Sequence, residues 1–199
     1  LKVIIDGYTK EAGVRRLERT IAKVLRKQAV KLAEGYEGKI TVGIKDLEDI
    51  LGPVKYTDSD LLKADSVGVV NGLAWTSVGG EMLQIEALCV EGTGKLELTG
   101  SLGDVMKESA KAAYSYIRSV AEDYNIPTDF YKTKDIHLHF PEGAVPKDGP
   151  SAGIGIVTAM VSALSGYTVK SSVAMTGEVT LTGRVLPIGG LKEKSMAAY

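Results

Sequence analysis

The sequence has little of the sulfur and imidazole chemistry on which many binding and catalytic sites depend. Its 199 residues include one cysteine, Cys89, and two histidines, His137 and His139. One cysteine excludes an internal disulfide, and so few soft ligands leave little for a transition-metal site. Cys89 lies in the apolar stretch LCV, which predicts a buried and unreactive thiol. We therefore expect neither a disulfide nor a metal site.

A strong charge of one sign and long apolar runs are absent as well. The chain has 24 lysines and arginines against 25 aspartates and glutamates, which gives a formal net charge of −1. A chain so nearly neutral has no general attraction to nucleic acid or to an anionic membrane. No apolar run approaches the roughly 20 residues that span a bilayer. With 44% hydrophobic residues, the chain is expected to be soluble, with one good core and a small second unit.

Both ends of the sequence favour a piece of a longer protein. The chain does not begin with methionine and has no signal-peptide pattern. It stops on KEKSMAAY without a residue that ends a helix. We therefore expect a fragment cut from something longer.

Residues 1–52 are expected to form a small, mostly helical unit. The segment 8–34 is predicted to be one amphipathic helix, because apolar residues recur at spacings of three and four. This face comprises Val14, Leu17, Ile21, Val24, Leu25, Ala29 and Leu32. A short strand at 39–43 and a short helix at 44–52 follow. Residues 53–65 are polar, open with Pro53, and are predicted to be an interdomain linker.

Residues 66–199 intermix strands and helices, so the chain is predicted to have an α+β fold. Asn71-Gly72 is a strong signal for a two-residue hairpin turn. Further strands are predicted at 81–92, 94–100 and 134–140 and twice within 171–190, and helices at 103–124, 151–165 and 190–199. The segment 134–140 alternates cleanly: Ile136, Leu138 and Phe140 share one face, and Asp135, His137 and His139 share the other.

The glycine-rich segment 91–100, EGTGKLELTG, is interpreted as a turn between two strands. A phosphate-binding loop needs a glycine five places before Gly94 and a serine or threonine after Lys95. The chain has Cys89 and Leu96 at these positions. The segment therefore predicts no nucleotide site.

Ser151 lies where a loop meets the first turn of a helix, so it is either a helix cap or an exposed nucleophile. The segment GPSAG fits the G-x-S-x-G motif of α/β hydrolases, but that motif needs an entering strand and a later histidine. No histidine follows Ser151 in the sequence. His137 and His139 could reach it only from upstream, and both are more simply explained as half-exposed strand residues.

A lysine is the next candidate for the base, because an uncharged amine can accept the serine proton. The ordinary pKa of lysine is about 10.4, so work near neutral pH requires a fall of about two to three units. Such a fall corresponds to about 3–4 kcal/mol and demands burial. The segment GGLKEKSMAAY offers Lys192 and Lys194, and periodicity favours Lys194 only weakly. A solvated helix lysine is the alternative for both.

The segments PKDGPSAG and MTGEVTLTGRVLPIGGLKEK closely resemble the proteolytic domain of the Lon family of ATP-dependent proteases. YTKEAGVRRLER is similar to the last helical subdomain of that family's AAA+ module, and VGVVNGLAWTSVGGEMLQIEA to the opening hairpin of its protease domain. The resemblance covers nearly the whole chain. It implies part of a small helical AAA+ subdomain at 1–52, a linker at 53–65, and a C-terminally incomplete, mixed α/β proteolytic domain at 66–199.

The resemblance also implies a Ser-Lys dyad, with Ser151 as nucleophile and Lys194 as general base. It implies that Thr176 accepts a hydrogen bond from this lysine and holds it in place. Asp148 and Glu178 belong to the same motifs and are expected only to shape the site. With Ser151 at a helix start, free N–H groups of the first turn are expected to stabilise the oxyanion of a tetrahedral intermediate.

For the intact protein, the resemblance implies an ATP-dependent serine endopeptidase that degrades unfolded or damaged proteins as a homo-hexamer. ATP and Mg are the implied cofactors, and Arg15 matches the AAA+ sensor arginine that contacts the γ-phosphate of ATP. This chain has no Walker A loop, so it is expected not to hydrolyse ATP, and no metal is expected in peptide hydrolysis. The implied location is the bacterial cytoplasm or, as second choice, the mitochondrial matrix.

Two alternative functions, neither of them enzymatic, stay open. A Lon-like domain kept for assembly, without peptidase activity, would have the same fold. Nucleic-acid binding is the other, because eight lysines or arginines and two glutamates lie between Lys10 and Lys31. Most such faces are simply solvated, and the net charge of the chain gives DNA binding no support.

Overall fold

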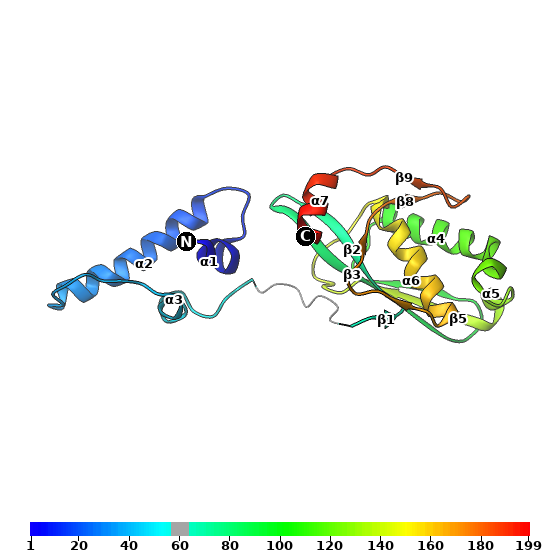
Figure 1. Ribbon diagram of the computed structural model, residues 1–199, viewed down its shortest axis with the longest axis horizontal. Helices are drawn as coiled ribbons and strands as arrows, with labels where there is room; N and C mark the ends of the chain where they lie inside the picture. Colours follow the sequence, from blue (N-terminus) through cyan, green and yellow to red (C-terminus); the bar gives the residue numbers. More distant parts are fainter. Residues whose placement is uncertain (57–63) are drawn as a thin grey trace. The chain divides into compact units, whose positions relative to one another are not determined.

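The computed structural model describes residues 1–56 and 64–199 (Figure 1). The chain divides into two compact units, Leu1–Asp58 and Ser59–Tyr199, each with a hydrophobic core of its own. Most of the predicted linker falls at 57–63, outside the described residues. Within the described part of the chain, no helix is both long enough and apolar enough to cross a membrane.

The first unit is helical, as predicted. Its elements are α1 (Lys2–Ile4), a π-helical turn η1 (Ile5–Thr9), α2 (Arg15–Ala33) and α3 (Ile44–Leu51). Its small core consists of Ile4, Tyr8, Val24 and Leu47. The Tyr8 hydroxyl donates a hydrogen bond to the Gly52 carbonyl at 3.0 Å, which ties the start of the unit to the end of α3.

The long helix predicted to start at residue 8 begins instead at Arg15. Lys10 has a φ of 29°, which no helical residue adopts, so the chain turns before α2. The Glu11 carboxylate then accepts a hydrogen bond from the Leu17 N–H at 2.9 Å, and so serves one of the N–H groups that a helix start leaves unpaired. The helix boundary therefore depends on a side chain outside the helix.

Two further predictions for this unit were wrong or only partly right. Residues 39–43 form no strand, and the structure gives them no ladder partner among the described residues. The apolar face predicted for α2 is buried at Val24, whereas Val14 and Leu25 are exposed. A periodic apolar stripe records which residues can be buried together, but this unit buries only part of the stripe.

The second unit is built on a five-stranded mixed sheet in the order β4-β5-β3-β2-β7. Its strands are β2 (Val69–Thr76), β3 (Gly79–Glu91), β4 (Leu96–Thr99), β5 (Lys134–His139) and β7 (Ala174–Met175). The β2/β3 and β3/β5 pairs are antiparallel, and the β4/β5 and β2/β7 pairs are parallel. Two small antiparallel ladders complete the unit: β1 (Ser66–Val67) with β6 (Thr168–Val169), and β8 (Glu178–Val179) with β9 (Val185–Leu186).

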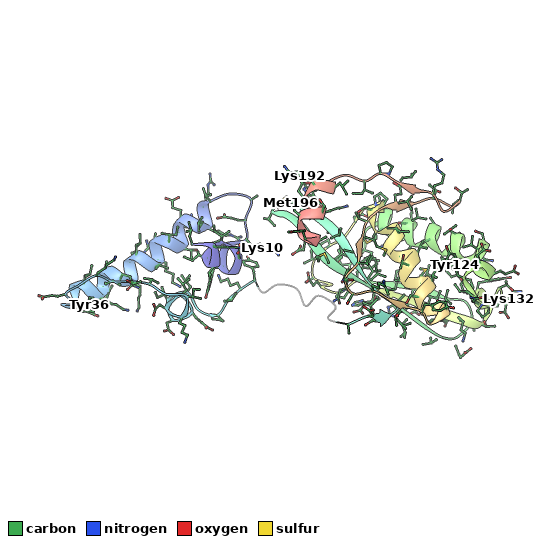
Figure 2. The ribbon with its side chains drawn as sticks, in the orientation of Figure 1. Lys10, Tyr36, Tyr124, Lys132, Lys192 and Met196 are labelled. Atoms are coloured by element: carbon green, nitrogen blue, oxygen red, sulfur yellow. The ribbon has the colours of Figure 1, made fainter. Side chains whose placement is uncertain are left out.

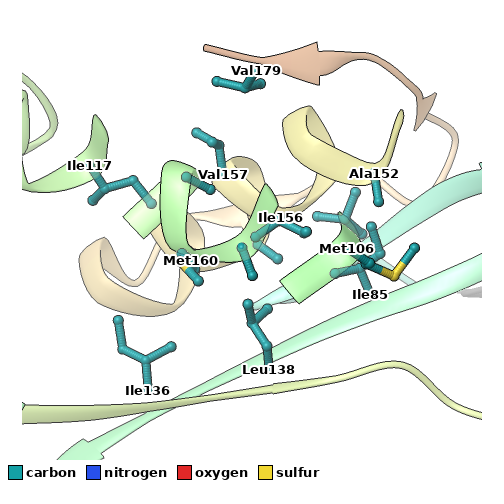
Figure 3. Packing of buried hydrophobic residues seen from close by; sticks show 14 of the residues in the cluster. Ile85, Met106, Ile117, Ile136, Leu138, Ala152, Ile156, Val157, Met160 and Val179 are labelled. Carbon is teal, nitrogen blue, oxygen red and sulfur yellow. The ribbon is translucent and has the colours of Figure 1, made fainter. Parts of the chain in front are cut away.

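Two helices, α4 (Asp104–Ser119) and α6 (Gly153–Ser165), pack on one face of this sheet (Figures 1 and 3). Shorter helical segments are η2 (Ala121–Tyr124), α5 (Phe130–Thr133), η3 (Pro150–Ala152) and α7 (Leu191–Ala198). Ile85 and Leu138 from the sheet meet Ile156 and Met160 of α6, and all four side chains are fully buried. Each such burial contributes about 1.5–3 kcal/mol to the free energy of unfolding.

The alternation predicted for residues 134–140 is confirmed. Ile136, Leu138 and Phe140 face the core and are at most 1% exposed. His137 and His139 lie on the opposite face, where their ring nitrogens are 2.8 and 2.7 Å from the Thr99 hydroxyl oxygen of neighbouring β4. These histidines are therefore partly exposed strand residues.

The hairpin turn predicted at Asn71-Gly72 was wrong. Strand β2 runs straight through both residues, and the chain turns at 77–78. Asn71 is buried, and its side-chain N–H donates to the Ser171 carbonyl at 2.8 Å. A Cβ on Gly72 would lie 3.2 Å from Ile85 Cδ1, so glycine at this position allows close packing and does not make a turn.

The glycine-rich segment after β3 is a turn, as predicted, and its backbone holds an anion from the chain itself. The N–H groups of Thr93 and Lys95 donate to Asp135 Oδ1 at 2.7 and 2.8 Å. These bonds, the one from Lys95 first, hold the pKa of the Asp135 carboxyl below its ordinary value. The backbone N–H groups that a phosphate-binding loop would offer to a phosphate therefore bind Asp135 here.

Cys89 is half-buried, so the prediction of a buried side chain is only partly right. Burial still raises the pKa of its thiol above the ordinary value. A raised pKa lowers the fraction of thiolate, which is the reactive form.

Candidate active site

Ser151 lies in the short 3-10 turn η3, directly before α6. Gly149 enters this turn with a φ of 128°, and Pro150 is its first residue. The predicted helix 151–165 is therefore a 3-10 turn that continues as α-helix from Gly153. Its predicted end is confirmed, because Gly166 caps α6 in the left-handed conformation with a φ of 79°.

The expectation of free N–H groups in the first turn was wrong for two of them. The Gly153 N–H donates to the Pro150 carbonyl, and the Ile154 N–H donates to the Gly177 carbonyl at 3.0 Å. Neither N–H group is free to donate to an oxyanion in this conformation. The Gly177 N–H in turn donates to the Ser151 carbonyl at 2.8 Å. The chain around Gly177 thus fixes the backbone on both sides of Ser151.

Lys194 is the buried residue of α7, with 3% of its surface exposed. Its Nζ lies 3.0 Å from Ser151 Oγ. Burial lowers the pKa of the Lys194 ammonium below its ordinary value, because leaving water disfavours the charged form. Lys192, the other candidate, is exposed on the outer side of the same helix, as is Met196 (Figure 2).

Thr176 links Lys194 to Ser151. Lys194 Nζ donates to Thr176 Oγ1 at 3.2 Å, and the Thr176 hydroxyl donates to the Ser151 carbonyl at 3.2 Å. Because the threonine proton is used on this carbonyl, the hydroxyl can offer Lys194 only an acceptor. The lone pair of an uncharged Lys194 amine therefore remains available for Ser151.

Asp148 ties the loop before Ser151 to helix α4. Its Oδ1 accepts hydrogen bonds from the N–H of Met106, in the first turn of α4, at 3.0 Å, and from the N–H of Gly149 at 2.9 Å. The carboxylate thus acts as an N-cap supplied from a distant part of the sequence. The Gly103 N–H reinforces this attachment by donating to the Lys147 carbonyl at 2.7 Å.

Lys147 is a residue of this site that the sequence reasoning missed. Its Nζ donates to the backbone carbonyls of Glu142 and Val145 at 2.8 and 3.1 Å, and so closes the loop 142–147 on itself. Burial lowers the pKa of Lys147, although Glu142 acts in the opposite direction. No sequence signal could have revealed this role, because both acceptors are main-chain atoms.

A cavity of about 720 Å³ opens over Ser151 and Lys194. Most of its wall is apolar and includes Leu73, Met82, Met106, Val145 and Ile188. Its lining residues also include Glu81, Glu142, Glu178 and Glu193. Its size suits a few side chains of an extended peptide. The arrangement can therefore hold a peptide beside a hydroxyl and a buried amine.

The remaining candidates lie elsewhere. Arg15 belongs to the first unit, where it is the exposed first residue of α2. His137 and His139 lie on the sheet face away from α4 and α6. Over residues 1–56 and 64–199, no group of three or more histidine, cysteine, aspartate or glutamate side chains could hold a metal ion.

Two family profiles match the chain. The Lon protease (S16) C-terminal proteolytic domain matches residues 41–199, and the Lon protease AAA+ ATPase lid domain matches residues 1–40. The boundary between the two matches precedes the boundary between the compact units, so α3 belongs to the first unit and to the second match.

Proteins that carry the name Lon protease are similar to nearly the whole chain. Those of Finegoldia magna and Clostridium acetobutylicum are 61% and 57% identical over 196 residues, and that of Aquifex aeolicus is 57% identical over 195 residues. Each alignment covers 98% of this chain but only 24–25% of the relative. The chain thus spans about a quarter of the length of the curated relatives it matches.

Proposed function

Because the chain belongs to the Lon protease family, we propose that it is the peptide-hydrolysing part of an ATP-dependent serine endopeptidase with a Ser-Lys dyad. Ser151 is the nucleophile and Lys194 is the general base. The observation that carries this proposal is the 3.0 Å contact between Lys194 Nζ and Ser151 Oγ beneath the cavity. Histidine plays no part in this scheme.

The electrostatics of the lysine support its role as base. Activity near neutral pH needs an uncharged amine, and this requires the pKa of lysine to fall by about two to three units. Lys194 is 3% exposed, and its burial lowers its pKa. Thr176 accepts a hydrogen bond from Nζ, which orients the amine so that its lone pair faces Ser151.

The reaction proceeds in two halves. Lys194 takes the Ser151 hydroxyl proton while Oγ attacks the peptide carbonyl carbon, and the resulting ammonium protonates the departing amine as the peptide bond breaks. The product is an acyl-enzyme with an ester bond to Ser151. Lys194, again uncharged, then removes a proton from water, and the hydroxide breaks the ester. The acid product leaves, and the proton held by Lys194 returns to Ser151 Oγ.

The wider activity rests on the family. We propose that the intact protein degrades unfolded or damaged proteins as a homo-hexamer in the bacterial cytoplasm, and that Arg15 acts as the nucleotide sensor. We retain the proposed division into an AAA+ lid segment at 1–52, a linker at 53–65 and a proteolytic domain at 66–199. Family membership supports this account, with the two profile matches assigning a lid and a proteolytic part.

Neither Arg15 nor the glycine-rich turn at 92–95 forms a nucleotide site by itself. Arg15 offers one exposed guanidinium, and the glycine-rich amides of Thr93 and Lys95 already bind Asp135. In this proposal ATP and Mg therefore bind with the help of residues other than these. No step of peptide hydrolysis in the proposed scheme passes through ATP.

The test is labelling with a fluorophosphonate, which reacts with an activated serine, combined with hydrolysis of an unstructured peptide at several pH values. We expect labelling that Ser151→Ala abolishes, and a rate that rises with pH as Lys194 loses its proton. Lys194→Gln should abolish both, whereas Lys192→Gln, on the exposed side of α7, should leave both near wild type.

Two outcomes would overturn the proposal. Normal rates in Lys194→Gln would exclude Lys194 as the base. Absence of Ser151-dependent labelling at every pH would favour the other reading, a Lon-like domain kept for assembly. Binding of DNA at low salt that weakens steeply as salt rises would instead support the nucleic-acid alternative.

A further inference from the structure

Helix α7, which carries Lys194, has few apolar contacts of its own. It has eight residues, and Lys194 is its buried one. Its largest apolar side chains, Leu191 and Met196, are 62% and 71% exposed. A helix this short is not stable by itself, so its position depends on whatever it packs against. That support must also fix where the Lys194 amine lies.

The support comes from the end of the β2/β3 hairpin. Trp75 and Gly80 face each other across this hairpin. The Trp75 side chain lies against Gly190, the residue before α7, where a Cβ would be 3.0 Å from Trp75 Cβ and Cγ. On the opposite strand, a Cβ added to Gly80 would overlap the backbone carbonyl of Glu193 and lie 3.0 Å from Ala197 Cβ.

Glu193 directly precedes Lys194, so the contact at Gly80 lies one residue from the proposed base. The carbonyl of Glu193 is a backbone atom and cannot rotate away as the end of a flexible side chain could. Any side chain at position 80 therefore displaces α7 itself. Gly80 differs in this respect from its neighbour Gly79, which has a φ of 128° and nothing within 4 Å of an added Cβ.

We propose that Gly80 is a positioning residue for catalysis: its missing side chain lets α7 settle on the hairpin, and this sets the Lys194–Ser151 distance. We call the end of the hairpin formed by Gly80 and Trp75 the seat of α7. Trp75 is its other half, because it fixes the start of α7 through Gly190. The inference rests on the proposed function of the two dyad residues. It adds that the hairpin determines whether the dyad forms.

Displacement of α7 would change the pH dependence of the rate, which loss of stability alone would not do. If α7 moves away from the hairpin, Lys194 regains water, and its pKa rises towards the ordinary value. The pH at which the rate reaches half its plateau then moves upward. A rise of one unit lowers the uncharged fraction about tenfold at any pH well below the pKa, and the rate falls with it.

The test compares Gly80→Ala with Gly189→Ala. Gly189 lies in the segment that leads into α7, and an added Cβ there would meet nothing within 4 Å. We expect Gly80→Ala to move the pH profile of peptide hydrolysis upward by about one unit and to lower the rate at pH 7 about tenfold. Gly189 lies in the cavity lining but not under α7, so we expect Gly189→Ala to keep the wild-type pH profile.

Tryptophan fluorescence gives a second readout that needs no activity. Trp75 is the one tryptophan in the sequence, so its emission reports the contact with Gly190 directly. Trp75 is 62% exposed, so in Gly80→Ala we expect its emission to change because the indole loses its contact with Gly190. A folded Gly80→Ala protein with wild-type emission and a wild-type pH profile overturns the proposal.

Failure of the inference and failure of the proposed function are distinguishable. If the wild type shows no Ser151-dependent labelling, the dyad is wrong, whereas a fluorescence change in Gly80→Ala still reports the seat of α7. If Gly80→Ala does not fold, Trp75→Leu tests the opposite half of the seat without adding bulk. The same upward shift of the pH profile is expected there, and an unchanged profile overturns the proposal.

Discussion

Lys194 Nζ lies 3.0 Å from Ser151 Oγ, although 43 residues separate the two in the chain. Two attachments produce this proximity. The Gly177 N–H and the Thr176 hydroxyl both donate to the Ser151 carbonyl, which fixes the serine. The end of the β2/β3 hairpin, at Gly80, holds the helix that carries the lysine. The hydroxyl and the amine are therefore brought together by parts of the fold that belong to neither residue's own element.

Thr176→Val should lower kcat about tenfold, because it removes the hydroxyl that orients Lys194 and keeps the size and branching of the side chain. A hydrogen bond of this kind contributes about 0.5–1.5 kcal/mol, and about 1.4 kcal/mol corresponds to tenfold in rate. The Ser151 carbonyl keeps its bond from Gly177, so the fold should persist. Thr176→Ser retains the hydroxyl and should stay close to wild type; an equal loss in both variants would contradict the orienting role.

Lys194→Met should change how stability depends on pH. The pKa of Lys194 is lowered in the folded protein, so between that value and about 10.5 the unfolded chain binds more protons. Raising the pH through this window therefore stabilises the wild type, whereas Met at this position does not titrate. The difference in free energy of unfolding, wild type minus Lys194→Met, should grow as pH rises from 7 to 10 in urea titrations.

Lys192→Met is the matched control for this measurement, because Lys192 is exposed on the same helix. Its stability should follow the pH dependence of the wild type. A difference between wild type and Lys194→Met that stays constant from pH 7 to 10 would mean that Lys194 does not lose its proton in this range, and the amine would not serve as the base.

Asp148→Ala should detach the loop before Ser151 from helix α4. The carboxylate accepts the N–H of Met106, and loss of a comparable cap costs about 1 kcal/mol of stability. We expect faster hydrogen exchange at the Met106 amide and a lower kcat. Asp148→Asn keeps an acceptor oxygen and should retain most of both. Unchanged exchange at Met106 in Asp148→Ala would show that the cap does not hold the loop.

Asp135→Asn should remove part of the acid sensitivity of the proteolytic unit. Two backbone N–H groups lower the pKa of Asp135 below its ordinary 3.8, so its charge stabilises the fold fully above that value. This contribution is lost as the pH falls below 3.8 through the folded-state pKa. Thermal unfolding should find the wild type ahead of Asp135→Asn at pH 6 and the gap smaller at pH 3. A gap independent of pH would contradict a charge effect.

Much of the fold follows from local pattern. The alternation of Ile136, Leu138 and Phe140, the left-handed glycine that ends α6 and the helix at 44–51 are properties of neighbouring residues, and each is confirmed. The misplaced hairpin has a clear physical reason. Asn71-Gly72 has the local chemistry of a turn, but burial of Asn71 and the packing of Ile85 against Gly72 favour a continuous strand. Tertiary packing outweighs turn propensity there.

The sequence by itself determined that a serine stands at a loop–helix junction, that no histidine follows it, and that two lysines near the end of the chain are candidate bases. Periodicity favoured Lys194 over Lys192 only weakly, because both lie on one helix with little amphipathic character, and it was the family resemblance that implied Lys194. The tertiary structure decided the surroundings of the two lysines: it buries Lys194 beside Ser151 and leaves Lys192 in water. Burial lowers an amine's pKa only where distant parts of the chain exclude water, and local sequence does not encode that exclusion.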